Sequence, residues 1–109
     1  MQHGAEQAAA MLRTLGNEQR LLLLCLLIEH GELNVGQLLA RVDLSQSALS
    51  QHLAVLREEG LVLTRRDAQT IYYSLAPGPA AAVMHTLHDI YCAPAVGAGA
   101  RKATRRNGA

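Results

Sequence analysis

Apolar residues recur every three or four positions in the first part of the chain, which is the period of an α-helix. Ala8, Leu12 and Leu15 mark one face of a first helix, which Gly16 ends. The next segment, Glu18–His30, is apolar on nearly all sides. A helix of that kind lies in the core rather than on the surface. The pattern therefore predicts a helix with one apolar face, followed by a buried helix.

Two further helices follow, separated by a short turn. Asn34 and Gln37 have the spacing of a capping box and predict the start of a short helix, whose apolar residues are Val35, Leu38, Leu39 and Val42. After a turn at residues 43–45, Ser45 is suited to cap a longer helix that ends at Gly60. The apolar stripe of this longer helix consists of Leu49, Leu53 and Leu56. A short helix, a turn and a longer helix form a helix-turn-helix.

The hydrophobic period then changes to two, which is typical of β-strands. Residues 61–66 and 70–75 are rich in β-branched or aromatic residues, and residues 67–69 form the tip of a hairpin between them. Pro79 suits the first turn of a last helix, which Pro94 ends. The predicted order is ααααββα. It describes a mainly α fold with a small β-hairpin, that is, a winged helix-turn-helix.

Length and composition favour one small domain. The chain has 109 residues, 50% of them hydrophobic, with three Tyr and no Phe or Trp, so we expect an aliphatic core. Residues 1–94 form the expected domain. Residues 95–109 are rich in Gly, Ala, Arg and Lys, and we expect them to be a disordered basic tail. A domain of this size gains stability from dimerisation.

The apolar and charged residues also limit the location and the partners of the protein. The longest apolar run, residues 21–28, is shorter than the roughly 20 residues that span a membrane. The N-terminus lacks the layout of a signal peptide, so we expect a cytoplasmic protein without membrane association. The net charge is +1, but four of the ten basic residues lie in the tail. No overall positive field attracts nucleic acid, so any DNA contact must come from a local surface.

The longer helix of the helix-turn-helix offers such a surface. Its polar face carries short hydrogen-bonding side chains that fit a major groove about 12 Å wide, where Gln pairs with adenine. Two arginines before the hairpin tip are placed to reach phosphates or a minor groove. The residues expected to contact double-stranded DNA are Gln46, Ser47, Ser50, Gln51, His52, Arg65 and Arg66. The alternative is an ordinary amphipathic helix in a module for protein contacts, which a salt-dependent DNA-binding assay tests.

Three motifs stand in order along the chain: LGNEQRL at residues 15–21, LSQSALSQHLAVLREEGLV at residues 44–62 and IYYSL at residues 71–75. They resemble, in turn, the entry into the second helix, the recognition helix and the second wing strand of the ArsR family of bacterial repressors. The resemblance extends over residues 8–92. It implies a winged-helix repressor, not an enzyme, that forms a homodimer through its first and last helices. An inducer lowers the DNA affinity of such a dimer.

Many members of that family sense metals, but the residues at their metal sites differ here. A Cys-x-Cys pair at the start of the third helix corresponds to Asn-Val-Gly at residues 34–36. An Asp-x-His pair at the start of the last helix falls on two prolines within residues 77–79. His85 and His88 remain, at a spacing suited to one metal ion. A metal-responsive repressor that uses these two histidines is therefore an alternative, and zinc titration of the reduced protein separates it from a thiol sensor.

The chain has two cysteines. Cys25 lies inside a leucine-rich run, where a free cysteine is often a small buried hydrophobe. Cys92 lies near the end of the last helix, where the helix dipole does not favour a thiolate. No Cys-x-x-Cys motif is present, which argues against a thiol oxidoreductase, and we expect no cofactor. A turnover assay with a thiol reductant tests the enzyme alternative.

The two cysteine positions together resemble the dithiol branch of the ArsR family, the BigR/SqrR-like sensors of persulfide and sulfane sulfur. Those proteins have one cysteine in a leucine-rich second helix and one near the end of the last helix. The resemblance implies that oxidation links Cys25 and Cys92, directly or through inserted sulfur atoms. Such a link shifts the last helix, the dimer and the spacing of the recognition helices on DNA. The implied inducers are persulfides or other reactive sulfur species, and the implied target genes handle sulfide or reactive sulfur.

Overall fold

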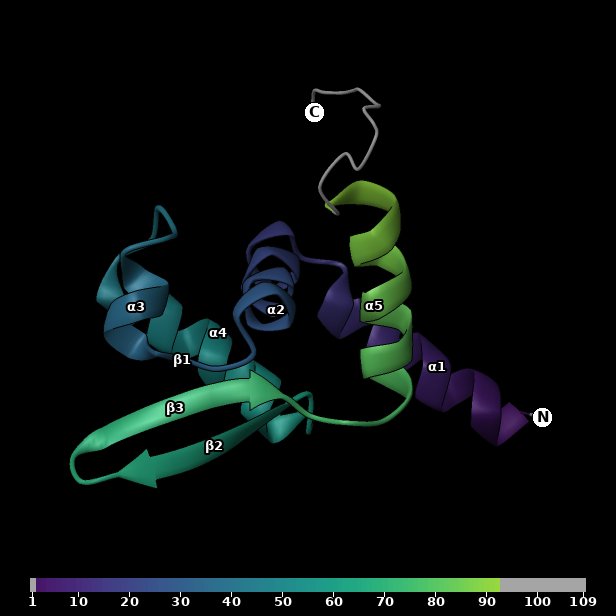
Figure 1. Cartoon of the computed structure of the whole chain (residues 1–109). Coiled ribbons are helices and arrows are strands. Elements are labelled where there is room, and N and C mark those ends of the chain that lie inside the picture. Colours follow the sequence, from purple (N-terminus) through teal and green to yellow (C-terminus); the bar gives the residue numbers. More distant parts are fainter. Residues whose placement is uncertain (1, 93–109) are drawn as a thin grey trace.

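Five helices and one three-stranded antiparallel sheet make up residues 2–92, the part of the chain that the computed structural model describes (Figure 1). In chain order the elements are α1 (Gln2–Leu15), α2 (Glu18–His30), β1 (Leu33–Asn34), α3 (Val35–Leu39), α4 (Gln46–Glu58), β2 (Val62–Asp67), β3 (Thr70–Leu75) and α5 (Pro79–Tyr91). Helices α3 and α4 form the helix-turn-helix, and the hairpin of β2 and β3 is the wing. The predicted winged helix-turn-helix is confirmed.

Helix α2 is the centre of the fold, as its apolar sequence predicts. It packs against α1, α4, α5 and β3, and Figure 1 shows it between the helix-turn-helix and α5. The largest fully buried side chains of the core are Leu23, Leu24, Leu27, Leu38, Leu49, Leu56 and Met84. The core is therefore aliphatic, and a single buried helix connects the helix-turn-helix to α5.

Side-chain caps start both helices of the helix-turn-helix at the predicted positions. The side-chain oxygen of Asn34 accepts from the backbone N–H of Gln37 at 2.8 Å, and the side chain of Gln37 accepts from the N–H of Asn34 at 2.9 Å. This reciprocal arrangement is the expected capping box. Ser45 Oγ accepts from the N–H of Ala48 at 3.0 Å. These bonds satisfy backbone donors that the first turn of a helix leaves unpaired.

The third helix and the hairpin tip differ from their predicted bounds. Helix α3 ends at Leu39, so Val42 belongs to the turn before α4 and not to the helix. Strand β2 continues to Asp67, so only Ala68 and Gln69 form the turn of the hairpin. Ala68 has a φ of 58°, the left-handed conformation that such two-residue turns require. The tip lacks a glycine, and the predicted loop was therefore one residue too long.

Strand β1 was absent from the predicted order. Its two residues pair with β3, where Leu33 lies opposite Tyr73 and Asn34 opposite Tyr72. A strand of two residues shows no alternating pattern, and Asn34 is already explained by its role as a helix cap. The sheet order is β1-β3-β2, so β3 is the central strand and β1 and β2 lie on its two edges.

The last helix is described as far as its C-cap, Cys92. The predicted helix end at Pro94 and the predicted tail at residues 95–109 lie outside the described residues and stay predictions. None of the helices within residues 2–92 has both the length and the apolar character to cross a membrane.

Candidate DNA-binding surface and cysteine pair

Helix α4 presents its polar face to solvent because its apolar stripe is turned into the core. Leu49, Leu53 and Leu56 are buried against the rest of the domain. The predicted DNA contacts on the other face are Gln46, Ser47, Ser50 and Gln51, which are exposed, and His52, which is half-buried. All five belong to the first half of α4, the end that contacts base edges in helix-turn-helix proteins. The structure thus gathers them on one end of one exposed helix.

The two predicted arginines of the wing differ in their surroundings. Arg65 donates to both carboxylate oxygens of Glu32, at 2.9 and 2.8 Å, and its guanidinium lies 4.6 Å from the centre of the Tyr72 ring. This hydrogen-bonded ion pair holds the pKa of Glu32 below its ordinary value. Arg66 donates to the carbonyl oxygen of Ala68 at 3.2 Å, and no acidic group of residues 2–92 forms an ion pair with it. The charge of Arg65 is therefore neutralised within the protein, and that of Arg66 is not.

Glu32, the partner of Arg65, is not among the residues that the sequence pattern predicts. The two residues are 33 positions apart, and no local pattern connects them. The contact follows from the sheet order. Glu32 directly precedes β1 and Arg65 belongs to β2, and these two strands lie on opposite edges of β3. The long Arg65 side chain passes over Tyr72 of β3 to reach the carboxylate. The sequence pattern did not reveal β1, and without this strand the contact between Glu32 and Arg65 could not be predicted.

Cys25 and Cys92 meet where α2 and α5 pack together. Their Sγ atoms are 3.5 Å apart, although the residues are 67 positions apart in the chain. Both are free cysteines; Cys25 is buried and Cys92 is exposed. Burial raises the pKa of the Cys25 thiol to about 12, and the hydrogen bond with Cys92, the charge of Cys92 and the charge of Glu29 act in the same direction. Cys25 is therefore held as a neutral thiol, and Cys92 is the sulfur that reagents in solution reach.

His85 and His88 do not share one environment. His88 is buried, and its Nε2 lies 3.2 Å from Oε2 of Glu29 on α2, whereas His85 is exposed. Within residues 2–92, no group of three or more His, Cys, Asp and Glu residues is arranged to hold a metal ion. The metal-responsive alternative therefore rests on the spacing of the two histidines alone and stays a prediction.

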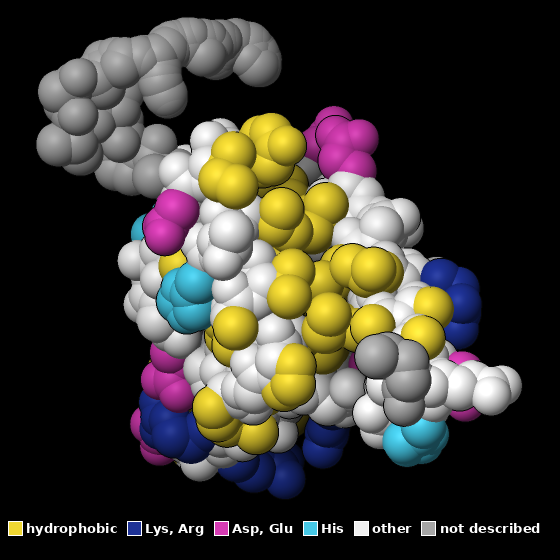
Figure 2. Space-filling view, turned by 90° about the vertical axis from the view of Figure 1, so that its right-hand side faces the viewer, with side chains coloured by type: hydrophobic (Ala, Val, Ile, Leu, Met, Phe, Trp, Pro, Cys, Tyr) yellow, Lys and Arg dark blue, Asp and Glu magenta, His cyan; other side chains and the backbone are white. Residues whose placement is uncertain are grey.

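An apolar surface extends over the side of the molecule formed by α1 and α5. Figure 2 shows hydrophobic side chains gathered along the middle of this face. The exposed large hydrophobic residues of the two helices are Leu12, at 57%, Ile90, at 61%, and Tyr91, at 79%. Contiguous apolar surface on an isolated protomer typically marks a contact with another protein.

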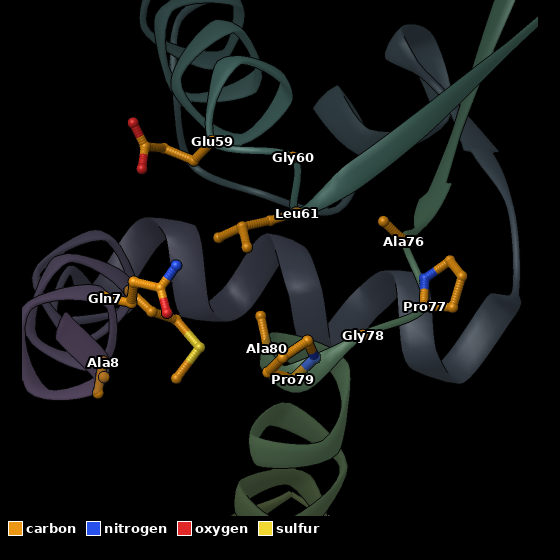
Figure 3. A pocket seen from close by; sticks show the side chains of 12 residues that line it. Gln7, Ala8, Glu59, Gly60, Leu61, Ala76, Pro77, Gly78, Pro79 and Ala80 are labelled. Atoms are coloured by element: carbon orange, nitrogen blue, oxygen red, sulfur yellow. The ribbon is translucent and has the colours of Figure 1, made fainter. Parts of the chain in front are cut away.

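A hollow of about 440 Å³ lies between α1, the corner from α4 to β2, and the start of α5 (Figure 3). Leu61 and Ala80 stand on opposite sides of it, and most of its wall is Gly, Ala and Pro. No sequence pattern predicts this hollow, because three separate segments of the chain form it. Its lining contains one acidic residue, Glu59, and neither a cysteine nor a histidine. The lining therefore offers no group of residues suited to metal binding or nucleophilic chemistry.

A helix-turn-helix with an exposed polar second helix, followed by a β-hairpin wing, is the architecture of a DNA-binding transcriptional regulator. Residues 17–64 match the family model described as bacterial regulatory protein, arsR family. The chain is 48% identical over 92 residues to the transcriptional activator HlyU of Vibrio cholerae, and the match covers 84% of each chain. We conclude that the chain belongs to the arsR family.

Two further comparisons agree with this assignment. The biofilm growth-associated repressor of Agrobacterium fabrum is 47% identical over 94 residues, which is 86% of this chain and 80% of that one. The crystal structure of the transcriptional repressor BigR from Xylella fastidiosa matches with a TM-score of 0.78 at 42% identity, over 84% of this chain and 90% of that one. The family resemblance seen in the three motifs is confirmed. The family consists of transcriptional regulators, so the enzyme alternative is wrong.

Proposed function

We propose that this protein is a cytoplasmic, homodimeric repressor that leaves its operator when persulfides oxidise Cys25 and Cys92. The observation that carries this proposal is the 3.5 Å separation of two free thiols on α2 and α5. Two of the three relatives named above are described as repressors, which supports repression, and HlyU is described as an activator. The resemblance to dithiol sensors supports target genes that handle sulfide or reactive sulfur.

The exposure of the two sulfurs assigns the order of the chemical steps. The Cys92 thiolate attacks the outer sulfur of a persulfide, R–S–SH, breaks its S–S bond and releases RSH, which leaves a persulfide on Cys92. Cys25 then loses its proton, attacks Sγ of Cys92 and displaces hydrogen sulfide. One persulfide and two thiols thus give one disulfide, one RSH and one H₂S, so the persulfide is reduced and the two cysteines are oxidised. A second persulfide equivalent inserts one more sulfur and gives a trisulfide.

The disulfide and the trisulfide require different distances between the two cysteine sulfurs at the α2–α5 interface. An S–S bond is about 2.04 Å long, so a direct disulfide draws the Cys25 and Cys92 sulfurs about 1.5 Å closer than they are now. Two such bonds, bent at the middle sulfur, span about 3.3 Å, which is near the present separation. A disulfide therefore pulls the end of α5 toward α2, and a trisulfide fits with little movement. If the extent of DNA release rises with the fraction of protein that contains the disulfide, displacement of α5 is supported as the cause of release.

The end of α5 also connects the cysteines to the dimer. Ile90 and Tyr91, directly before Cys92, are exposed hydrophobic residues of α5, the helix that forms the apolar surface together with α1. We place the contact with the second copy on this surface, because a small domain gains stability by covering exposed apolar area. A dimer of this class reads two half-sites about 34–36 Å apart. Movement of α5 against α2 therefore changes the spacing of the two α4 helices.

Mass spectrometry combined with a DNA-binding assay tests the proposal. The protein is treated with a persulfide. Each sample is then divided between peptide mapping and a gel-shift assay on the DNA upstream of the gene that encodes the protein. We expect a covalent link between the Cys25 and Cys92 peptides to appear together with loss of the DNA complex. Dithiothreitol removes the link and restores binding. Release of the DNA in samples without a Cys25–Cys92 link contradicts the proposal.

A further inference from the structure

A second polar pair lies one helical turn from the cysteines, between the same two helices. Glu29 follows Cys25 by four residues on α2, so these two residues lie on the same face of α2. His88 likewise precedes Cys92 by four residues and lies on the same face of α5. Nε2 of His88 lies 3.2 Å from Oε2 of Glu29, and the two Sγ atoms lie 3.5 Å apart. The α2–α5 interface therefore contains a thiol pair beside an imidazole–carboxylate pair.

The surroundings of His88 are poor in water and acidic in charge. Its side chain is 10% exposed, and that of Glu29 is 42% exposed. The acidic groups of residues 2–92 within 4.0 Å of the His88 ring are Glu29 on α2 and the well-exposed Asp89 on α5 itself, at 3.9 Å. The other titratable groups of α2 and α5 near this pair are the thiols of Cys25 and Cys92 and the exposed His85, which lines a hollow with Leu27 and Ile28 of α2. Histidine is the side chain whose charge ordinarily changes between about pH 5 and 8.

The charge of Glu29 opposes the thiolate that Cys25 must form in order to attack. It is one of the causes that raise the pKa of Cys25 to about 12, after burial and the contact with Cys92. A protonated His88 paired with Glu29 cancels the negative charge of the carboxylate, whereas a neutral His88 leaves it in place. The protonation state of His88 therefore changes the free energy of the Cys25 thiolate.

We infer that the Glu29–His88 pair controls the reactivity of the cysteine pair. His88 is a positioning residue: when protonated it offsets the Glu29 carboxylate and favours the Cys25 thiolate, and when neutral it leaves the carboxylate to oppose that thiolate. The inference rests on the proposed function, in which Cys25 performs the second, link-forming step. Because of this pair, the reaction of Cys25 slows less on acidification than the reaction of a buried thiol without it.

The reaction of Cys25 with methyl methanethiosulfonate measures its thiolate without DNA and without a link. In the full-length Cys92→Ser protein Cys25 is the only thiol, and mass spectrometry follows its modification. At about pH 9, where histidine is neutral, Glu29→Gln is expected to raise the rate about threefold, a shift of half a pKa unit. The amide still accepts a hydrogen bond from His88, so only the charge is removed. At about pH 6, His88→Gln is expected to lower the rate about threefold, and at about pH 9 to leave it unchanged.

His85→Gln is the matched control, because His85 is exposed and lies one turn earlier on the same helix. Its rates are expected to equal those of the parent at both pH values. A merely structural role loosens the interface and speeds the reaction of the Glu29 and His88 variants alike at every pH. That result, or unchanged rates in both variants, overturns the inference. If His88→Gln does not fold, as judged by circular dichroism, His88→Asn takes its place in the measurements at both pH values.

The result is independent of the operator. If the rates change as expected but persulfide does not release DNA from the protein, the proposed function fails and the electrostatic role of the pair stands. If persulfide links the cysteines and releases DNA but the rates of the variants are those of the parent, the proposed function stands and this inference fails.

Discussion

The α2–α5 interface and the wing each join residues that are far apart in the sequence, but the two contacts differ in their access to water. At the α2–α5 interface, each contact joins a buried group to an exposed one: Cys25 is buried and Cys92 exposed, and the side chains of His88 and Glu29 are 10% and 42% exposed. In the wing, the side chains of Arg65 and Glu32 are 54% and 37% exposed. One region therefore holds one member of each pair against the core, and the other holds both members at the surface.

This difference decides what each contact does. Burial, followed by the contact with Cys92 and the charge of Glu29, raises the pKa of Cys25 to about 12. A covalent change at this position alters how the two helices pack. Water and salt screen an exposed ion pair, so a DNA phosphate can replace Glu32 as the partner of Arg65. The buried contact suits a switch, and the exposed one suits an adjustable DNA contact.

The largest effect is expected when either cysteine is removed. Cys25→Ser and Cys92→Ser should each bind the operator as reduced protein, and neither should release it after persulfide treatment. One sulfur can be modified in each variant, but it has no second sulfur to which it can be linked. Gel-shift titrations of reduced and treated protein on the same DNA measure the difference.

Folding of the Cys25 variant must be checked first. Serine at this buried position places a hydroxyl among leucines, which destabilises the fold by about 1–3 kcal/mol if the hydroxyl is unpaired. Cys25→Ala, which buries no polar group, is the matched control, and circular dichroism and dimer mass verify both. A well-folded single variant that releases DNA like the parent would falsify the two-cysteine link and leave modification of one thiol as the cause.

The next effect concerns the exposed polar face of α4, which we predict to contact base pairs of the operator. Ser47→Ala and Gln51→Ala should each weaken operator binding by about 1–3 kcal/mol, the usual value of a base contact, and leave the dimer intact. Competition with mutated operators shows which base pair each residue reads. Ala54→Ser, at an exposed position farther along α4, is a control for changes in the helix itself. Parent-like affinity in both variants removes these two residues from the readout.

The helices could be predicted from the sequence because their signals are local. Asn34 with Gln37 and Ser45 with Ala48 lie within one turn of one another, and they cap α3 and α4 as expected. The burial of Cys25 likewise follows from the leucines around it. Each of these features depends on neighbours in the chain, so periodicity and capping rules detect them.

The contacts between elements could not be predicted in this way. The approach of Cys25 to Cys92 followed only from the family resemblance, because no local rule fixes how α2 packs on α5. The Glu29–His88 pair was missed, although its residues stand four positions from the two cysteines, on the same helix faces. The Arg65–Glu32 pair had no signal at all, because it depends on a two-residue strand.

A smaller effect is expected from residues 95–109. This segment lacks apolar periodicity, so its removal should leave the melting temperature unchanged. Its four positive charges should add affinity for DNA of any sequence, and their loss should lower nonspecific binding and flatten its dependence on salt. Replacing only the four basic residues by Gln is the matched control for the deletion. A large fall in melting temperature in the deletion alone shows that the segment packs on the domain.

The smallest effects are expected in the wing, where they test the contrast with the α2–α5 interface most directly. Arg66→Ala should reduce the slope of log affinity against log salt by about one, because its charge meets a phosphate without an internal competitor. Arg65→Ala should reduce that slope less, since Glu32 already neutralises Arg65. Glu32→Gln should raise affinity and steepen the slope, because it frees the Arg65 charge and leaves its contact with Tyr72 in place. Equal slopes for the two arginine variants, together with unchanged affinity in Glu32→Gln, would show that DNA does not compete with the exposed pair.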